Sequence, residues 1–160
     1  MAGHRSKIAP MPQSLGLVIV HIVFSTKERH PWLVEDARPR LHAYLATVAR
    51  TLGCECSRAG GVADHVHLAI RLSRTITIAD FVEKVKTTSS KWVKTLSPDL
   101  ALFCWQRGYG AFSVEPADLD SLLTYIDGQE AHHRTQTFQD EFRACLSKYK
   151  MDYDETYVWD

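Results

Sequence analysis

The sequence lacks several features that would assign a chain to a class at once. No apolar run approaches the ~20 residues of a membrane-spanning helix, and no apolar stretch follows the basic residues near Met1, so we expect neither a membrane span nor a secretory signal. Cysteine is scarce: four residues in 160 do not suggest a disulfide framework, since 45% hydrophobic content is enough to build a core without one. We therefore expect one cytoplasmic domain over residues 1–160 with reduced thiols.

An excess of charge is also absent. Lysine plus arginine and aspartate plus glutamate number 19 each, so the formal net charge is zero. A protein that coats nucleic acid without selectivity is usually strongly basic. Any nucleic-acid contact must therefore come from a local basic patch.

One stretch, Asp64 to Leu72, carries the first candidate site. As a β-strand it places His65 and His67 on one side and alternating apolar residues on the other. A rise of about 3.3 Å per residue sets the two imidazoles roughly 6 to 7 Å apart at their roots, close enough to bind one divalent cation. The simpler alternative is a half-exposed strand with two solvated histidines. A site for a soft metal built with Cys54 and Cys56 is a further alternative.

Hydrophobic periodicity and turn residues predict an α+β fold. The order strand, helix, strand, strand, helix, strand is the ferredoxin-like βαββαβ arrangement, a four-stranded antiparallel sheet with both helices on one face. The other face, which carries the histidines, is expected to be open, and open sheet faces of this kind bind nucleic acid. The predicted elements are strands at 15–24, 54–59, 64–72 and 111–114 and helices at 35–52 and 78–96.

A third helix beginning at Pro116 brings the second half of the candidate site. Tyr125 and Gln129 lie one turn apart on it, so a phenol and an amide can reach the same small volume. Tyr109, between two glycines, is a rival nucleophile. The adjacent pair His132 and His133 diverges by about 100° on a helix, so we expect it to cap or support the site rather than to chelate an ion.

The remaining segments are secondary to the site. A leader at 1–15 is expected to be flexible, a last helix begins at Thr137, and the aromatic tail at 151–160 is expected to dock on the body through Tyr153, Tyr157 and Trp159. Basic residues on the second helix and in the loop after the first strand are candidate nucleic-acid contacts, although an ordinary solvated surface explains them too. They are Lys27, Arg29, Lys84, Lys91 and Lys94.

These motifs together resemble the single-tyrosine, IS200-like transposases of the HUH nuclease superfamily, which move small insertion sequences as single-stranded DNA. The resemblance runs from Gly16 to the end of the chain and rests on the combination rather than on the histidine pair alone. The matching segments are 21–27, 64–68, 91–92, 108–114, 125–126 with Gln129, 132–133 and 153–160.

The resemblance implies a function and a site. Tyr125 would be the nucleophile, and His65, His67 and Gln129 would hold Mg²⁺ or Mn²⁺. Such enzymes act as homodimers, with active sites that can be shared between chains. They cut single-stranded DNA at hairpin-bearing element ends, form a 5′-phosphotyrosine link and rejoin the strand. The chain departs from the family at Gly128, where relatives usually have a better helix former.

Two other functions are compatible with the same residues. A derived protein could bind folded single-stranded nucleic acid without cutting it, using Lys84, Lys91, Lys94 and the open sheet face. A hydrolytic site is the second, in which a metal-bound water rather than Tyr125 attacks the phosphodiester.

Overall fold

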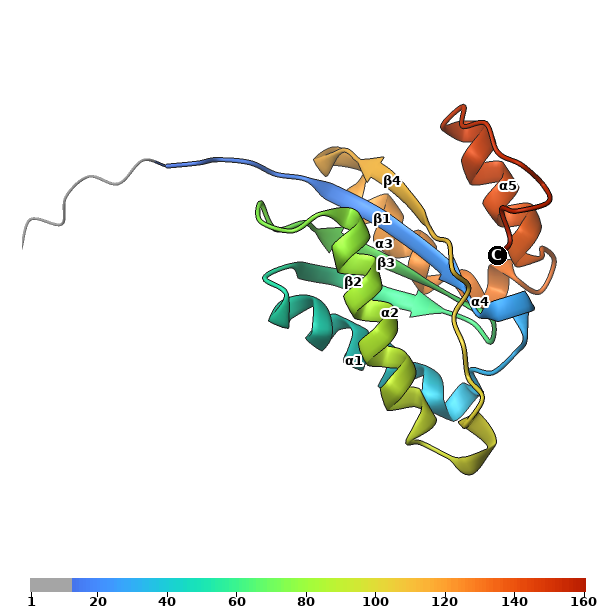
Figure 1. Ribbon diagram of the computed structural model, residues 1–160. Coiled ribbons are helices and arrows are strands. Elements are labelled where there is room, and N and C mark those ends of the chain that lie inside the picture. The colour runs from blue at the N-terminus through green and yellow to red at the C-terminus, as the bar shows by residue number, and fades with distance from the viewer. Residues whose placement is uncertain (1–12) are drawn as a thin grey trace, which may run out of the picture.

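A computed structural model describes residues 13–160, and its centre is a four-stranded antiparallel sheet (Figure 1). The strands lie in the order β2-β3-β1-β4, which is the order of a ferredoxin-like fold and confirms the prediction. They are β1 (Ile19–Ser25), β2 (Glu55–Gly61), β3 (His65–Arg71) and β4 (Gly110–Val114).

One face of the sheet packs on the two long helices, α1 (Arg38–Thr51) and α2 (Ile78–Lys94). The alternation predicted for β3 is correct, because Val66, Leu68 and Ile70 all belong to this core and are fully buried. The residues that these helices contribute recur at helical spacing: Leu41, Leu45 and Val48 from α1, and Phe81, Val82, Val85 and Val93 from α2.

The second face of the sheet is covered, and here the sequence-based expectation of an open face is wrong. Three helices lie over it: α3 (Leu119–Asp127), α4 (Gln129–His132) and α5 (Phe138–Lys148) (Figure 1). His65 and His67 are therefore completely buried. The cover has its own apolar cluster of Val23 and Phe112 from the sheet and Phe138, Phe142 and Leu146 from α5.

Two glycines allow the covering helices to come close to the strands. A β-carbon at Gly60 would lie 2.6 Å from Ile126 Cγ2 and 3.1 Å from the Ile126 carbonyl oxygen. At Gly110 it would lie 2.5 Å from Phe142 Cε2. A side chain at either position would clash. Gly60 therefore permits the close packing of α3 on the sheet, and Gly110 permits that of α5.

Several predicted boundaries need correction. The first strand begins at Ile19 rather than at residue 15, and β2 runs from Glu55 to Gly61 rather than from residue 54 to residue 59. Gly128 does not lie within a helix: it ends α3 and precedes α4, so the helix penalty expected of it does not apply. Short 3₁₀ helices precede or follow the longer elements at Lys27–Arg29, Glu35–Ala37, Pro98–Leu100 and Pro116–Asp118.

The structure describes the tail at 151–160 but only the last residues of the leader at 1–15. The predicted leader, 1–15, lies almost wholly outside the described residues. In the tail, Trp159 packs on the α5 cluster and its carbonyl accepts a hydrogen bond from Arg29, whereas Tyr153 and Tyr157 are 39% and 68% exposed and do not dock as expected. Among residues 13–160, no helix has the length and apolarity that a membrane crossing requires.

Candidate active site

Four separate elements bring polar side chains together beneath the covered face of the sheet. His65 and His67 come from β3, Tyr125 from α3, Gln129 from the first position of α4, and Glu141 from α5. The two histidine rings are 5.0 Å apart between centroids, and the His67 and Tyr125 rings are 5.6 Å apart. The structure therefore unites all four residues that the sequence assigned to the site, and it does so within one chain.

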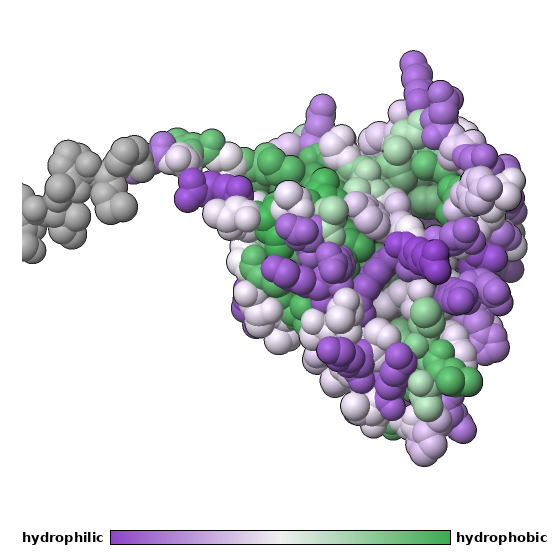
Figure 2. All heavy atoms as spheres, in the orientation of Figure 1, coloured by the Kyte–Doolittle hydropathy of each residue, from purple (hydrophilic) through white to green (hydrophobic). Residues whose placement is uncertain are grey.

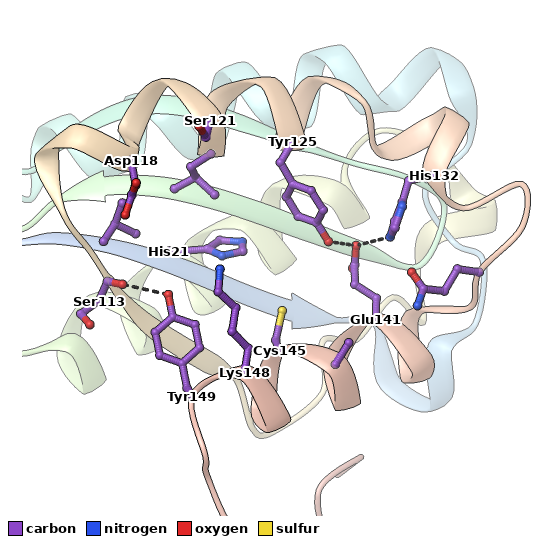
Figure 3. A pocket seen from close by; sticks show the side chains of 14 residues that line it. His21, Ser113, Asp118, Ser121, Tyr125, His132, Glu141, Cys145, Lys148 and Tyr149 are labelled. Atoms are coloured by element: carbon purple, nitrogen blue, oxygen red, sulfur yellow. Dashed lines mark hydrogen bonds and ion pairs between the residues drawn. The ribbon is translucent and has the colours of Figure 1, made fainter.

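Glu141 is the centre of this arrangement, and the sequence analysis did not identify it. Its carboxylate is 3% exposed and accepts a hydrogen bond from the hydroxyl of Tyr125 (Figure 3). It also accepts one from Gln129 Nε2 at 2.9 Å, and one of its oxygens lies 3.0 Å from His67 Nε2. Burial opposes its negative charge, but contacts with His133, His65 and His67 outweigh burial and hold the pKa of Glu141 far below its usual range. The site thus contains a buried, ionised carboxylate.

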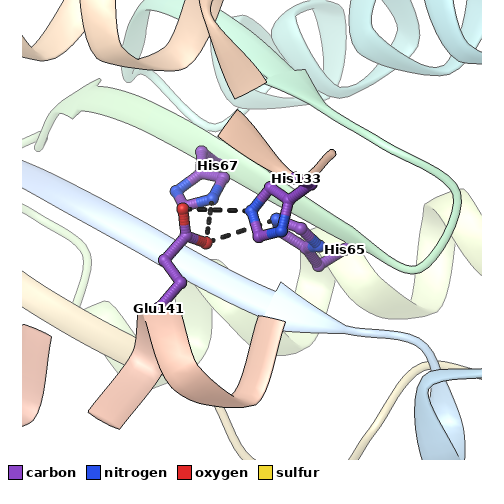
Figure 4. A group of neighbouring side chains, drawn as sticks. All are labelled: His65, His67, His133 and Glu141. Atoms are coloured by element: carbon purple, nitrogen blue, oxygen red, sulfur yellow. Dashed lines mark hydrogen bonds and ion pairs between the residues drawn. The ribbon is translucent and has the colours of Figure 1, made fainter. Parts of the chain in front are cut away.

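His133 joins the same cluster. Its Nε2 lies 3.1 Å from Glu141 Oε2, and ligand atoms of His65, His67, His133 and Glu141 all lie within 4.8 Å of one another (Figure 4). His132 Nε2 approaches the same carboxylate at 3.4 Å from a more exposed position. The 100° angle expected between the His132 and His133 side chains holds only within a helix, and α4 ends at His132, so His133 lies just outside it.

The His65 ring is fixed from both sides. Its Nδ1 lies 2.7 Å from a carboxylate oxygen of Asp64, and its Nε2 lies 2.9 Å from Gln129 Oε1 and 3.4 Å from Glu141 Oε1. Burial alone would lower its pKa, but the hydrogen bonds to Asp64 and Glu141 raise the pKa of His65 to about 9.

The His67 ring is held by a further histidine. His21, on the neighbouring strand β1, places Nε2 at 2.8 Å from His67 Nδ1, with the two rings stacked. Burial, with the neighbouring His67, lowers the pKa of His21 to about 3, and burial also lowers the pKa of His67. Both rings are therefore neutral near pH 7 and can act as donor and acceptor to each other.

Tyr125 is a protonated phenol in this arrangement. Burial and the negative charge of Glu141 raise the pKa of Tyr125 well above its usual range. A phenol is a poor nucleophile until its proton is lost, so Tyr125 is a weak nucleophile while the Glu141 carboxylate beside it is uncompensated.

A cleft of about 510 Å³ leads to Tyr125 between α3, β4 and α5 (Figure 3). Tyr125, His132 and Glu141 lie at one part of it, and Lys148 of α5 lies farther along, near His21. A positive side chain in a cleft that reaches the phenol is suited to hold a phosphate.

The other predicted residues lie elsewhere. Lys84, Lys91 and Lys94 are exposed on α2, on the opposite side of the sheet from the histidines, where Figure 2 shows hydrophilic side chains among neutral ones. Tyr109, the rival nucleophile, lines a different pocket beside Lys86. Lys27 and Arg29 follow β1, and the Arg29 guanidinium lies 5.8 Å from the Trp159 ring.

Comparison with known proteins identifies the family. A sequence profile of the IS200-like transposases matches residues 14–129, well over half of the chain. The chain belongs to the IS200-like transposase family. The predicted resemblance is confirmed, and transposition is the family's activity.

Individual proteins that resemble the chain include one transposase similar in sequence and two solved structures similar in fold. The ISDra2 transposase TnpA of Deinococcus radiodurans is 26% identical over 114 residues, which cover 68% of this chain and 81% of that protein. A crystal structure of a putative transposase from Deinococcus radiodurans superposes with a TM-score of 0.59 at 23% identity, covering 76% of this chain and 98% of that one. A REP-associated tyrosine transposase bound to a REP hairpin superposes with a TM-score of 0.57 at 13% identity, covering 79% and 74%. The two solved structures share the fold.

The match to the family profile stops before the last two members of the polar cluster, His133 and Glu141. It includes His65, His67, Tyr125 and Gln129, and it ends at Gln129. His133 and Glu141 thus lie in the part of this IS200-like chain that follows the matched region. One sequence signal points to Glu141: it is an acidic residue on the same helical stripe as Phe138, Phe142 and Cys145.

Proposed function

We propose that this IS200-like transposase cleaves and rejoins single-stranded DNA at hairpin-bearing element ends, with Tyr125 as the nucleophile. The observation that carries the proposal is the position of the Tyr125 hydroxyl, which shares the Glu141 carboxylate with the His65 and His67 rings in the same chain. A phenol, two imidazoles and a cleft that leads to them are the parts that a phosphodiester transfer needs.

The proposed reaction conserves the energy of the phosphodiester bond. The phenolic oxygen of Tyr125 loses its proton and bonds to phosphorus, the bond from phosphorus to the 3′ oxygen breaks, and that oxygen takes up a proton as a free hydroxyl. The product is a 5′-phosphotyrosine ester. A 3′ hydroxyl can then attack this ester, reseal the strand and restore Tyr125 without an external energy source.

His65, His67 and Gln129 are proposed to hold Mg²⁺ or Mn²⁺. A bound divalent cation would polarise the scissile phosphate and stabilise the departing oxygen. The residues suit this role because two imidazole nitrogens and the Gln129 amide oxygen already converge, with Gln129 Oε1 at 2.9 Å from His65 Nε2. Gln129 also donates to Glu141, which fixes the orientation of its amide.

The proposed partner is a DNA hairpin with a single-stranded flank, and the active form is proposed to be a homodimer. Support comes from the REP-associated transposase, which shares this fold and is bound to a REP hairpin. Exposed basic residues on α2 offer a local positive surface despite the neutral total charge. Exchange of α3 between protomers would create shared active sites with the same set of side chains.

A cleavage assay tests the proposal. A labelled single strand that carries a hairpin is incubated with the protein and Mg²⁺ or Mn²⁺, and protein-linked DNA is sought on a denaturing gel. Wild type is expected to form the covalent product and Tyr125→Phe to form none. Tyr109→Phe is the matched control, because Tyr109 lies in a different pocket, and it is expected to cleave normally.

Two results would replace the proposal. Hairpin binding without any covalent product in either metal would indicate a binding protein derived from a transposase, a function that the protonated state of Tyr125 beside Glu141 favours. Cleavage that survives Tyr125→Phe would indicate a hydrolytic site with water as the nucleophile.

A further inference from the structure

We infer that Glu141 and His133 are metal ligands, and that they complete with His65 and His67 a site of three imidazole nitrogens and one carboxylate. This inference rests on the metal site of the proposed function and extends it to α5, beyond the region that the family profile matches. The ligand atoms of these four residues already lie within 4.8 Å of one another (Figure 4).

The hydrogen bond on the far side of the His65 ring fixes its tautomer. The Asp64 carboxylate can only accept, so the contact of 2.7 Å requires the proton on His65 Nδ1. In neutral His65, Nε2 then presents a lone pair to Gln129 Oε1 and Glu141 Oε1, which are both oxygen acceptors. A proton on Nε2 satisfies this contact in the free protein, and a bound cation would take the place of that proton among the same three atoms.

His133 repeats the pattern independently. Its Nδ1 lies 2.7 Å from the backbone carbonyl oxygen of Gln136, which again can only accept. The Nε2 lone pair is thereby directed at Glu141 Oε2, 3.1 Å away, and this buried nitrogen has no hydrogen-bond partner among the described residues. A ring held by a carbonyl on one nitrogen, with the other free to ligate, is the usual arrangement of metal-binding histidines.

His67 completes the set through His21. With His21 Nε2 as the acceptor, the proton lies on His67 Nδ1, and His67 Nε2 is free to bind an ion at the position 3.0 Å from Glu141 Oε1. Each of the three imidazoles thus has an outer partner: Asp64, His21 or the Gln136 carbonyl. These partners point every Nε2 toward the same carboxylate.

Glu141 supplies a negative charge to the proposed ligand set, in which the imidazoles would bind the ion as neutral ligands. A carboxylate at 3% exposure is costly to bury unless it is paired, and a divalent cation among neutral imidazoles pairs it directly. Three imidazoles with one carboxylate form a borderline donor set, which favours Zn²⁺ or Mn²⁺ over Mg²⁺. We therefore expect binding to tighten in the order Mg²⁺, Mn²⁺, Zn²⁺.

The test uses the purified full-length chain after chelator treatment, titrated with Mn²⁺ while free Mn²⁺ is measured by electron paramagnetic resonance. Glu141→Gln and His133→Gln are each expected to weaken Mn²⁺ binding tenfold or more. Glu130→Gln is the matched control: Glu130 is exposed on the neighbouring helix α4, and its variant should bind as wild type does. Circular dichroism verifies that each variant is folded.

X-ray absorption on the wild-type complex counts the ligands without any mutation. Three imidazoles about the ion support the inference, and two overturn it. Unchanged Mn²⁺ affinity in folded Glu141→Gln also overturns it, yet leaves the proposed function standing if cleavage still depends on Tyr125. Failure of the wild-type chain to bind Mn²⁺, Zn²⁺ or Mg²⁺ would overturn both this inference and the metal assistance in the proposed function.

Discussion

The hydroxyl of Tyr125 donates a hydrogen bond to the carboxylate of Glu141, which lies sixteen residues later on a different helix. This contact joins the proposed nucleophile to the group that also holds the histidines. It keeps the phenol protonated while the carboxylate is uncompensated, because the negative charge raises the pKa of Tyr125. A cation bound by Glu141 would remove that effect, so metal binding and activation of Tyr125 are expected to be coupled.

Substitution of Gly60 tests whether the close packing of α3 on β2 determines the position of Tyr125, the proposed nucleophile. Gly60→Ala would place a methyl group 2.6 Å from Ile126 Cγ2, next to Tyr125, and overpacking of this kind costs about 1 to 3 kcal/mol. The cleavage rate is expected to fall at least tenfold, and urea unfolding should show the lost stability.

Gly16→Ala provides the control, since a β-carbon at Gly16 meets nothing within 4 Å. Equal cleavage rates in Gly60→Ala and wild type would show that the approach of α3 to β2 does not position Tyr125.

Asp64 is expected to act through the His65 ring. Asp64→Asn removes the carboxylate that fixes the His65 tautomer, and loss of such an outer partner costs about 10- to 100-fold in metal affinity. Calorimetric titration with Mn²⁺ measures the change. Asp152→Asn, at an exposed position in the tail, should bind as wild type does, and an unaltered affinity in Asp64→Asn would argue against the assigned tautomer.

Lys148 offers a test of the cleft. Because it lies in the same cleft as Tyr125, Lys148→Gln is expected to weaken the contact with the DNA backbone and to raise the KM for the strand several-fold, with little change in kcat. Loss of this phosphate contact should also make DNA binding by the variant less sensitive to salt than binding by the wild type. Lys150→Gln, just beyond the end of α5, is the comparison, and similar kinetics for both variants would exclude the cleft as the path of the strand.

His42 makes stability depend on pH at a position remote from the site. Burial, with a smaller effect of Arg38, lowers the pKa of His42 from 6.5 to about 4, so between these values the unfolded chain takes up a proton that the folded chain does not. Stability is therefore retained above pH 6.5 and lost as the pH falls toward 4.

His42→Gln is expected to reduce the loss of unfolding free energy between pH 7 and pH 5, as measured by urea denaturation at each pH. His30→Gln, at an exposed position, should keep the wild-type difference. If His42→Gln also keeps it, protonation of His42 does not contribute to acid instability.

The sheet could be predicted from the sequence because its signals are local. The alternation along 65–71 determines which side chains of β3 face the α1–α2 core, and the stripes of Leu41 and Leu45 or Phe81 and Val85 repeat every three to four residues. Neither prediction requires knowledge of distant contacts.

The covered face could not be predicted, because it depends on packing between segments far apart in sequence. Nothing local to Gly60 shows that Ile126 will lie against it, and the helix from Pro116 was assumed to continue through Gly128. In a continuous helix the side chains of His132 and His133 would point about 100° apart. Glu141 has only a weak local signature, because one acidic residue beside Phe138 and Phe142 on a helix does not by itself predict a site.

The most direct measurement is mass spectrometry of the adduct formed with a hairpin-bearing single strand in Mn²⁺, after digestion with nuclease and trypsin. Trypsin releases residues 108–134 as one peptide, which contains both Tyr109 and Tyr125, so fragmentation must locate the modification. We predict a 5′-phosphonucleotide on the Tyr125 oxygen. The same modification on Tyr109, or cleaved DNA with no modified tyrosine in any peptide, would contradict the account.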